Sequence, residues 1–165
     1  MAENFSFDIV SDYDRQELVN ALDQVRREIA QRYDLKGSNT LVELEKENIF
    51  VTTDSELTLN AVNDIIRQKA IKRKLSLKIF DYKQTENVSG NKVKQTILLK
   101  KGLNQEIAKK ISKNIREELK KINVSINGDA LRVSSKSKDD LQFVIKLIDK
   151  FEELYNVPLQ VNNFR

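Results

Sequence analysis

Three residue types are missing from this 165-residue chain, which has no histidine, no cysteine and no tryptophan. Without an imidazole or a thiolate, the sequence excludes a serine–histidine–aspartate triad, a cysteine nucleophile, a zinc–thiolate site and any disulfide bond. The chain has only four glycines, and neither of the glycine-rich phosphate loops, G-x-G-x-x-G or G-x-x-x-x-G-K-[ST], occurs. Carboxylate pairs such as Asp12 and Asp14 stand at expected helix starts, where they stabilise the helix dipole. We therefore expect a protein that is not an enzyme, with no catalytic residue, metal site or cofactor.

Long apolar runs are also missing. No stretch approaches the roughly 18 apolar residues that a membrane span needs. The N-terminus, MAENFSFDIV, has no basic segment followed by an apolar one, so no secretory signal is expected. These features predict a cytoplasmic protein without a membrane partner. At roughly 150 residues per domain, the length allows one domain or two small ones.

The charge is unevenly distributed along the chain. The formal net charge is +4, but residues 1–90 carry 13 basic and 16 acidic side chains, a net −3. Residues 91–165 carry 16 basic and 9 acidic side chains, a net +7. A polyanion would therefore be attracted mainly to the second half of the chain.

The first half of the chain predicts the order strand, helix, strand, strand, helix, strand. Residues 5–10 alternate between apolar and polar side chains, which indicates a strand with one buried face. The two helices are expected to begin at Asp14 and at 54–55, where the residue types suit helix N-caps. A turn at 46–48 predicts a hairpin between the helices. Alternation over 75–79 predicts the fourth strand.

The second half repeats this order. Residues 93–100 predict a strand, and Asn104 is the expected cap of the following helix. The Asn-Gly pair at 127–128 is the strongest hairpin signal in the chain. Ser137, with an aspartate three residues later, resembles a capping box, and 159–164 predict the last strand.

An internal repeat links the two halves. Residues 51–55, VTTDS, match residues 133–137, VSSKS, and both precede an expected helix. The sequence therefore predicts an α+β protein made of two tandem ferredoxin-like βαββαβ domains. In each domain, two helices would cover one face of a four-stranded antiparallel sheet and leave the other face open.

The expected domain boundaries follow from composition. The first domain would cover residues 1–82 and the second residues 93–165, joined by a polar linker at 83–92. One alternative stays open at the N-terminus. The strand at 5–10 would belong to the first domain, but it could instead pair with the second sheet.

The two open sheet faces are predicted to differ in charge. The face of the first domain is expected to be acidic and to hold two aromatic rings; its expected members are Ser6, Asp8, Glu43, Glu45, Phe50, Thr52, Ser76, Lys78 and Phe80. The face of the second domain is expected to contain an arginine, amides and an aromatic ring without a carboxylate; its expected members are Thr96, Leu98, Ser125, Arg132, Ser134, Gln160, Asn162 and Phe164. Arginine and amide groups can bind phosphate and base edges, so the second face is the better candidate site.

Four blocks of the sequence resemble the YajQ family of bacterial proteins: SFDIVS at 6–11, RYDLKG at 32–37, GDALRVSSKSKDDLQ at 128–142 and QVNNFR at 160–165. The blocks occur in family order and span almost the whole chain. The resemblance implies tandem domains with a fold similar to RNA-binding ribonucleoprotein domains, in a cytosolic protein without known catalysis. It also implies nucleotide binding, with nucleic acid or, for some members, cyclic di-GMP as the ligand.

The candidate site combines the residues of the second face with neighbouring cations. Arginines would clamp phosphate or guanine, lysines would supply counter-charge, amides would read base edges, and the aromatic ring would stack or else anchor the C-terminus. The candidate residues are Arg132, Lys136, Lys138, Gln160, Asn162, Phe164 and Arg165. The predicted ligand is RNA or cyclic di-GMP, and a protein partner is a further possibility. The alternative function is a protein–protein interaction scaffold in which both sheet faces are covered.

Overall fold

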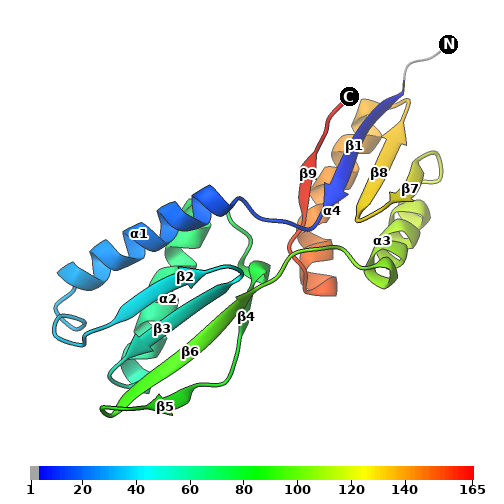
Figure 1. The fold of residues 1–165 in the computed structure, drawn as a ribbon. Helices are drawn as coiled ribbons and strands as arrows, with labels where there is room; N and C mark the ends of the chain where they lie inside the picture. Colours follow the sequence, from blue (N-terminus) through cyan, green and yellow to red (C-terminus); the bar gives the residue numbers. More distant parts are fainter. Residues whose placement is uncertain (1–3) are drawn as a thin grey trace. The chain divides into compact units, whose positions relative to one another are not determined.

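The computed structural model describes residues 4–165 of the chain (Figure 1). Residues 1–3, which the expected first domain included, lie outside the described residues. The elements in chain order are β1 (Phe5–Val10), α1 (Arg15–Gln31), β2 (Leu41–Glu45), β3 (Asn48–Thr53), α2 (Glu56–Lys72), the 3₁₀ helix η1 (Leu77–Ile79), β4 (Phe80–Tyr82), β5 (Glu86–Val88), β6 (Lys92–Leu99), α3 (Gln105–Glu118), β7 (Asn123–Asn127), β8 (Ala130–Ser135), α4 (Lys138–Tyr155) and β9 (Gln160–Asn162).

The chain forms two compact units, one of which is discontinuous in sequence. The continuous unit is Tyr13–Lys100, and the split unit consists of Lys101–Arg165 together with the described N-terminal residues 4–12. Each unit has its own hydrophobic core. Among the described residues, no helix combines the length and the apolar character that crossing a bilayer requires.

The split unit contains a four-stranded antiparallel sheet in the order β7-β8-β1-β9. Figure 1 shows β1, in blue, between β8 and β9. Phe7 and Ile9 of β1 are buried in the same core as α3 and α4. The strand therefore supplies part of the centre of a unit whose other described elements all follow residue 100.

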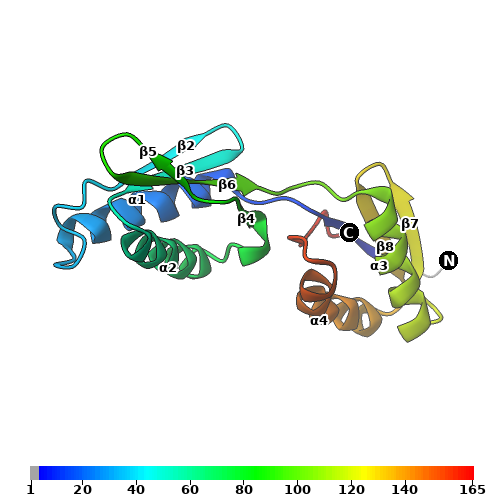
Figure 2. The same cartoon turned by 90° about the horizontal axis from the view of Figure 1, so that it is seen from below.

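The continuous unit has the equivalent sheet, in the order β2-β3-β6-β4. The short strand β5 pairs with the first three residues of β6, at 92–94. Helices α1 and α2 cover one side of this sheet (Figure 2). Ile49 of β3 and Ile97 of β6 are opposite each other in the register, and both are fully buried. β6 therefore occupies the central position in this sheet that β1 occupies in the split unit.

The fold class is confirmed: the chain is α+β, with two ferredoxin-like units built on antiparallel sheets. The strand partners differ from the expected division in two places. The strand at 93–100, expected in the second domain, lies in the sheet of the continuous unit, and the strand at 5–10 follows the alternative pairing with the second sheet. Residues 86–88 of the expected linker form β5. Alternation along one segment identifies a strand and its buried face, but it does not identify the partner strand.

The four helices begin where their capping residues predict. The side chains of Asp14, Ser55, Asn104 and Ser137 each accept a hydrogen bond from a backbone N–H in the first helical turn. The expected strand at 75–79 is wrong. Ser76 instead caps the 3₁₀ helix η1, and the strand begins only at Phe80.

Candidate functional site

The open face of the split unit carries a row of polar side chains, one from each strand. Arg132 of β8 is opposite Ser125 of β7 and opposite Asp8 of β1, and Asp8 is in turn opposite Asn162 of β9. Directly opposed residues in a sheet place their side chains on the same face. Gln160, two residues before Asn162, belongs to the same face. The register thus brings together three of the predicted site residues.

Asp8 was expected on the face of the other domain, and its presence here is a correction. Nε of Arg132 donates a hydrogen bond to Oδ1 of Asp8 over 3.1 Å, and Nδ2 of Asn163 donates to Oδ2 over 3.0 Å. The hydrogen bond from Arg132 is the largest cause that lowers the pKa of Asp8, and burial opposes it. The prediction of a face without a carboxylate is therefore wrong, because β1 joins this sheet.

The pair of Asp8 and Arg132 fixes the direction of the guanidinium group. The side chain of Asp8 is 14% exposed and that of Arg132 is 40% exposed, so the carboxylate lies close to the sheet and the guanidinium group extends toward solvent. Within residues 4–165, Asp8 engages Nε and leaves both terminal amino groups of Arg132 without a hydrogen-bond partner. Such an arginine can still form the two parallel hydrogen bonds that phosphate or guanine accepts.

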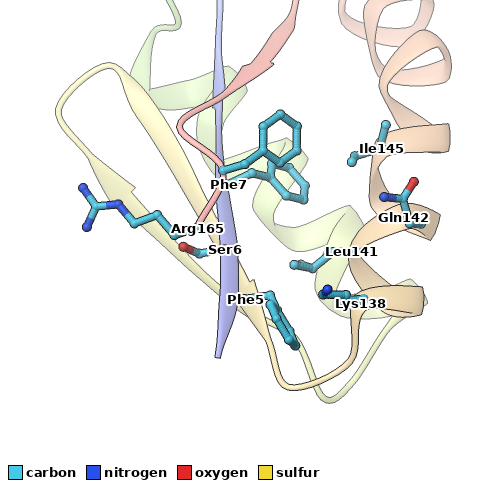
Figure 3. A pocket seen from close by; sticks show the side chains of 9 residues that line it. Phe5, Ser6, Phe7, Lys138, Leu141, Gln142, Ile145 and Arg165 are labelled. Carbon is cyan, nitrogen blue, oxygen red and sulfur yellow. The ribbon is translucent and has the colours of Figure 1, made fainter. Parts of the chain in front are cut away.

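Arg165, the last residue, extends the same face along β1. Its backbone exchanges two hydrogen bonds with Ser6, of 2.9 and 3.1 Å, so the chain continues beside β1 beyond the end of β9. Figure 3 shows its side chain on the opposite side of β1 from the phenyl ring of Phe7. The structure therefore places Arg165 with Arg132, on the side of the sheet away from the helices.

Phe164 does not share this face. Its ring contacts that of Phe7, with centroids 6.0 Å apart, and Phe7 is a core residue on the helix side of the sheet. In a regular strand, Asn162 and Phe164 would point the same way. The backbone of Asn163 has φ of 57°, in the left-handed region that asparagine tolerates, and this conformation interrupts the alternation. The placement of Phe164 beside Arg132 is thus wrong.

A groove lies on the helix side, between the start of α4 and the strand β1. Its volume is about 430 Å³, and its lining includes Lys138 and Phe164. Figure 3 shows Phe5 and Lys138 at one end of the groove and Phe7 and Ile145 at the other. The ammonium group of Lys138 lies 4.7 Å from the centre of the Phe5 ring, which is a cation–π contact.

Lys136 joins neither the sheet face nor this groove. It is exposed and lines a separate hollow that also contains Lys121 and the carboxylate residue Asp140. The seven predicted residues therefore fall in three places. Arg132, Gln160, Asn162 and Arg165 share the open face; Lys138 and Phe164 line the groove, to which Arg165 also contributes; Lys136 stands apart.

Sequence reasoning missed the residues that complete the groove. The alternation at 5–10 predicts only that Phe5 and Phe7 form the buried side of a strand, and Gln142 enters only as part of a family block. The structure places all three in the lining of the groove. The signal for Gln142 was its place one turn after Lys138, because residues four apart lie on the same side of a helix. The position of Phe5 beside α4 depends on the pairing of β1 with β8, which no local pattern shows.

A family model described as nucleotide-binding protein YajQ-like matches residues 5–165. The chain belongs to the YajQ-like family. A nucleotide-binding protein of Prochlorococcus marinus strain MIT 9515 is 79% identical to it, and one of Parasynechococcus marenigrum strain WH8102 is 58% identical; each alignment covers 100% of both chains. The YajQ-like match therefore includes both units and all of the predicted site residues.

Proposed function

We propose that this chain is a non-enzymatic nucleotide-binding protein that holds its ligand on the open sheet face of the split unit. The description of the family and the names of the relatives support nucleotide binding. The observation that carries the location is the strand register, because it lines up Arg132, Asn162 and Gln160 on one face.

The groups on this face suit a nucleotide in two ways. Arg132 is held by Asp8 in one direction, so its terminal amino groups bind phosphate with less loss of side-chain freedom. Gln160 and Asn162 are exposed amides that can both donate to and accept from a base edge. An open sheet face suits single-stranded RNA, whose bases are unstacked and accessible, and RNA is the ligand that we propose. Cyclic di-GMP is the second candidate.

The test uses the full chain, a single-stranded RNA and a series of salt concentrations. If Arg132 and Arg165 each contact one phosphate, the plot of log K against log salt should have a slope of about −1.4. Arg132→Gln should reduce the slope to about −0.7 and weaken binding about tenfold. The matched control is Arg27→Gln on α1, an exposed arginine of the continuous unit, which should change neither value.

Other ligands are titrated in parallel to identify the class. Saturable binding of one cyclic di-GMP with a weak salt dependence would replace RNA with a cyclic dinucleotide on the same face. Equal effects of Arg132→Gln and Arg27→Gln would contradict the location of the site. If RNA, GTP and cyclic di-GMP all fail to bind, the sheet-face site is wrong and the protein-scaffold function becomes the better explanation of that face.

A further inference from the structure

The groove beside α4 has a counterpart in the continuous unit, and the register identifies it. Phe7 of β1 is opposite Val133, and Gln95 of β6 is opposite Val51, which is the repeated position of Val133. On the helices, Asn63 of α2 follows its N-cap by the same number of residues as Ile145 of α4. The continuous unit thus has two amides where the split unit has a phenyl ring and an isoleucine.

In the continuous unit, hydrogen bonds connect the elements around this position. Nδ2 of Asn63 donates to Oε1 of Gln95 over 2.9 Å, and Nε2 of Gln95 donates to the backbone oxygen of Lys83 over 2.9 Å. The chain after β4 then continues past the start of α2, where the hydroxyl of Thr85 donates to Glu56 over 3.3 Å. The segment after β4 therefore lies across the space between helix and sheet.

The same two positions have opposite character in the split unit. Glu56 follows the N-cap of α2, as Lys138 follows the N-cap of α4. Thr85 precedes Glu86, which pairs with β6, as Phe164 precedes Arg165, which pairs with β1. The hydrogen-bonded pair of Glu56 and Thr85 in the continuous unit thus corresponds to Lys138 and Phe164 in the split unit. No hydrogen bond joins an ammonium group to a phenyl ring, and a groove lies between them.

The lining of the groove selects the kind of ligand that would fit. Phenyl rings and the aliphatic side chains of Leu141 and Ile145 form most of it, and its charged side chains are those of Lys138 and Arg165, with no aspartate or glutamate side chain. The volume of about 430 Å³ falls in the range of small-molecule sites, which are mostly apolar with a few polar groups. Aromatic side chains stack on planar rings. Lys138 favours an anion at the end of the groove that it shares with Phe5, away from Phe7.

We infer that this groove binds the planar base of a nucleotide, with the phosphate of that nucleotide beside Lys138. The inference rests on the proposed function, and it adds a base site on the helix side to the phosphate contacts of the sheet face. Phe164 is the stacking residue, because its side chain is 64% exposed while its ring contacts the ring of Phe7, which is 1% exposed. Gln142 supplies an exposed amide for the edge of the base.

The experiment measures the binding of AMP, adenosine and inorganic phosphate to the full chain. Phe164→Ala should weaken AMP and adenosine by between about fivefold and about a hundredfold, the range for loss of one base–aromatic stack. The matched control is Phe143→Ala, another exposed phenylalanine of the split unit that does not line the groove. The control variant should bind AMP as the unchanged protein does.

A second pair of variants tests the phosphate end. Lys138→Gln should weaken AMP several-fold and leave adenosine unchanged, because only AMP carries the anion. Lys146→Gln, an exposed lysine on the same helix, should affect neither ligand. The backbone amide NMR signals of positions 138 and 142 should shift on addition of AMP, and the dispersion of the whole amide spectrum shows that each variant is folded.

The outcomes separate this inference from the proposed function. If AMP binds and Phe164→Ala matches Phe143→Ala, the base site is wrong while the sheet-face site can still stand on the Arg132→Gln result. If Phe164→Ala weakens AMP but Arg132→Gln leaves RNA binding unchanged, the groove stands and the sheet-face site fails. If neither AMP nor adenosine binds to the unchanged protein, the groove is not a base site.

Discussion

The open sheet faces of the two units differ because the units exchange their central strands. β1 brings Asp8 onto the face of the split unit, where it pairs with Arg132. β6 brings Lys94 onto the face of the continuous unit, where its ammonium group lies 4.8 Å from the centre of the Phe50 ring. Each face thus receives one charge opposite to the charge expected for it. The electrostatics of a sheet face therefore depend on which strands pair in that sheet, and the composition along the chain does not determine them.

The strand exchange makes a strong prediction about stability. Ile9 of β1 and Ile97 of β6 are both fully buried, each at the centre of its sheet. Replacing either with alanine should cost about 2–5 kcal/mol of unfolding free energy, because the cavity adds to the lost burial. Ile9→Ala should act on the split unit, and Ile97→Ala on the continuous unit. Hydrogen exchange should therefore rise in β8 and α4 for the first variant and in β3 and α2 for the second.

The two variants serve as controls for each other. If the two units did not exchange strands, β1 would belong to the unit that contains α1, and β6 to the unit that contains α3. Ile9→Ala would then increase hydrogen exchange in α2 and β3, and Ile97→Ala would increase it in α4 and β8. That reversed pattern would contradict the pairing described above.

Local signals in the sequence were sufficient for the elements but not for their partners. Ser137 and Asn104 cap helices as predicted, because a cap depends on residues within one helical turn. Arg132 and Asn162 were correctly assigned to the open face of the second sheet, since the alternation of a strand has a period of two. Asp8 was misplaced because its partner Arg132 is 124 residues away along the chain. Phe164 was misplaced because one left-handed residue, Asn163, reverses the alternation.

The buried amides of the continuous unit give a smaller predicted effect. Gln95→Leu should cost about 1–3 kcal/mol, because it leaves the Nδ2 group of buried Asn63 without its acceptor. Adding Asn63→Ile should recover part of that loss, since the pair then becomes apolar, as Phe7 and Ile145 are in the split unit. Urea unfolding of both variants measures the two values. A double variant that is less stable than Gln95→Leu alone would contradict this account, in which the unpaired amide of Asn63 is the main cost.

The smallest expected effect concerns Asp8 and the pH dependence of the split unit. The hydrogen bond from Arg132 lowers the pKa of Asp8 in the folded state, so the pair adds stability above the unfolded-state pKa of about 3.9. That contribution is lost as the pH falls through the lower folded-state pKa. It should be at most about 1 kcal/mol, because Arg132 is partly exposed to solvent.

Asp8→Asn should therefore lower stability near pH 6 and reduce its decline between pH 5 and pH 3, as measured by hydrogen exchange of β8. Asp149→Asn, at an exposed position on α4, is the matched control and should keep the steeper decline of the unchanged protein. Parallel curves for Asp8→Asn and the unchanged protein would mean that the pair only directs Arg132 toward the ligand and adds nothing to the stability of the unit.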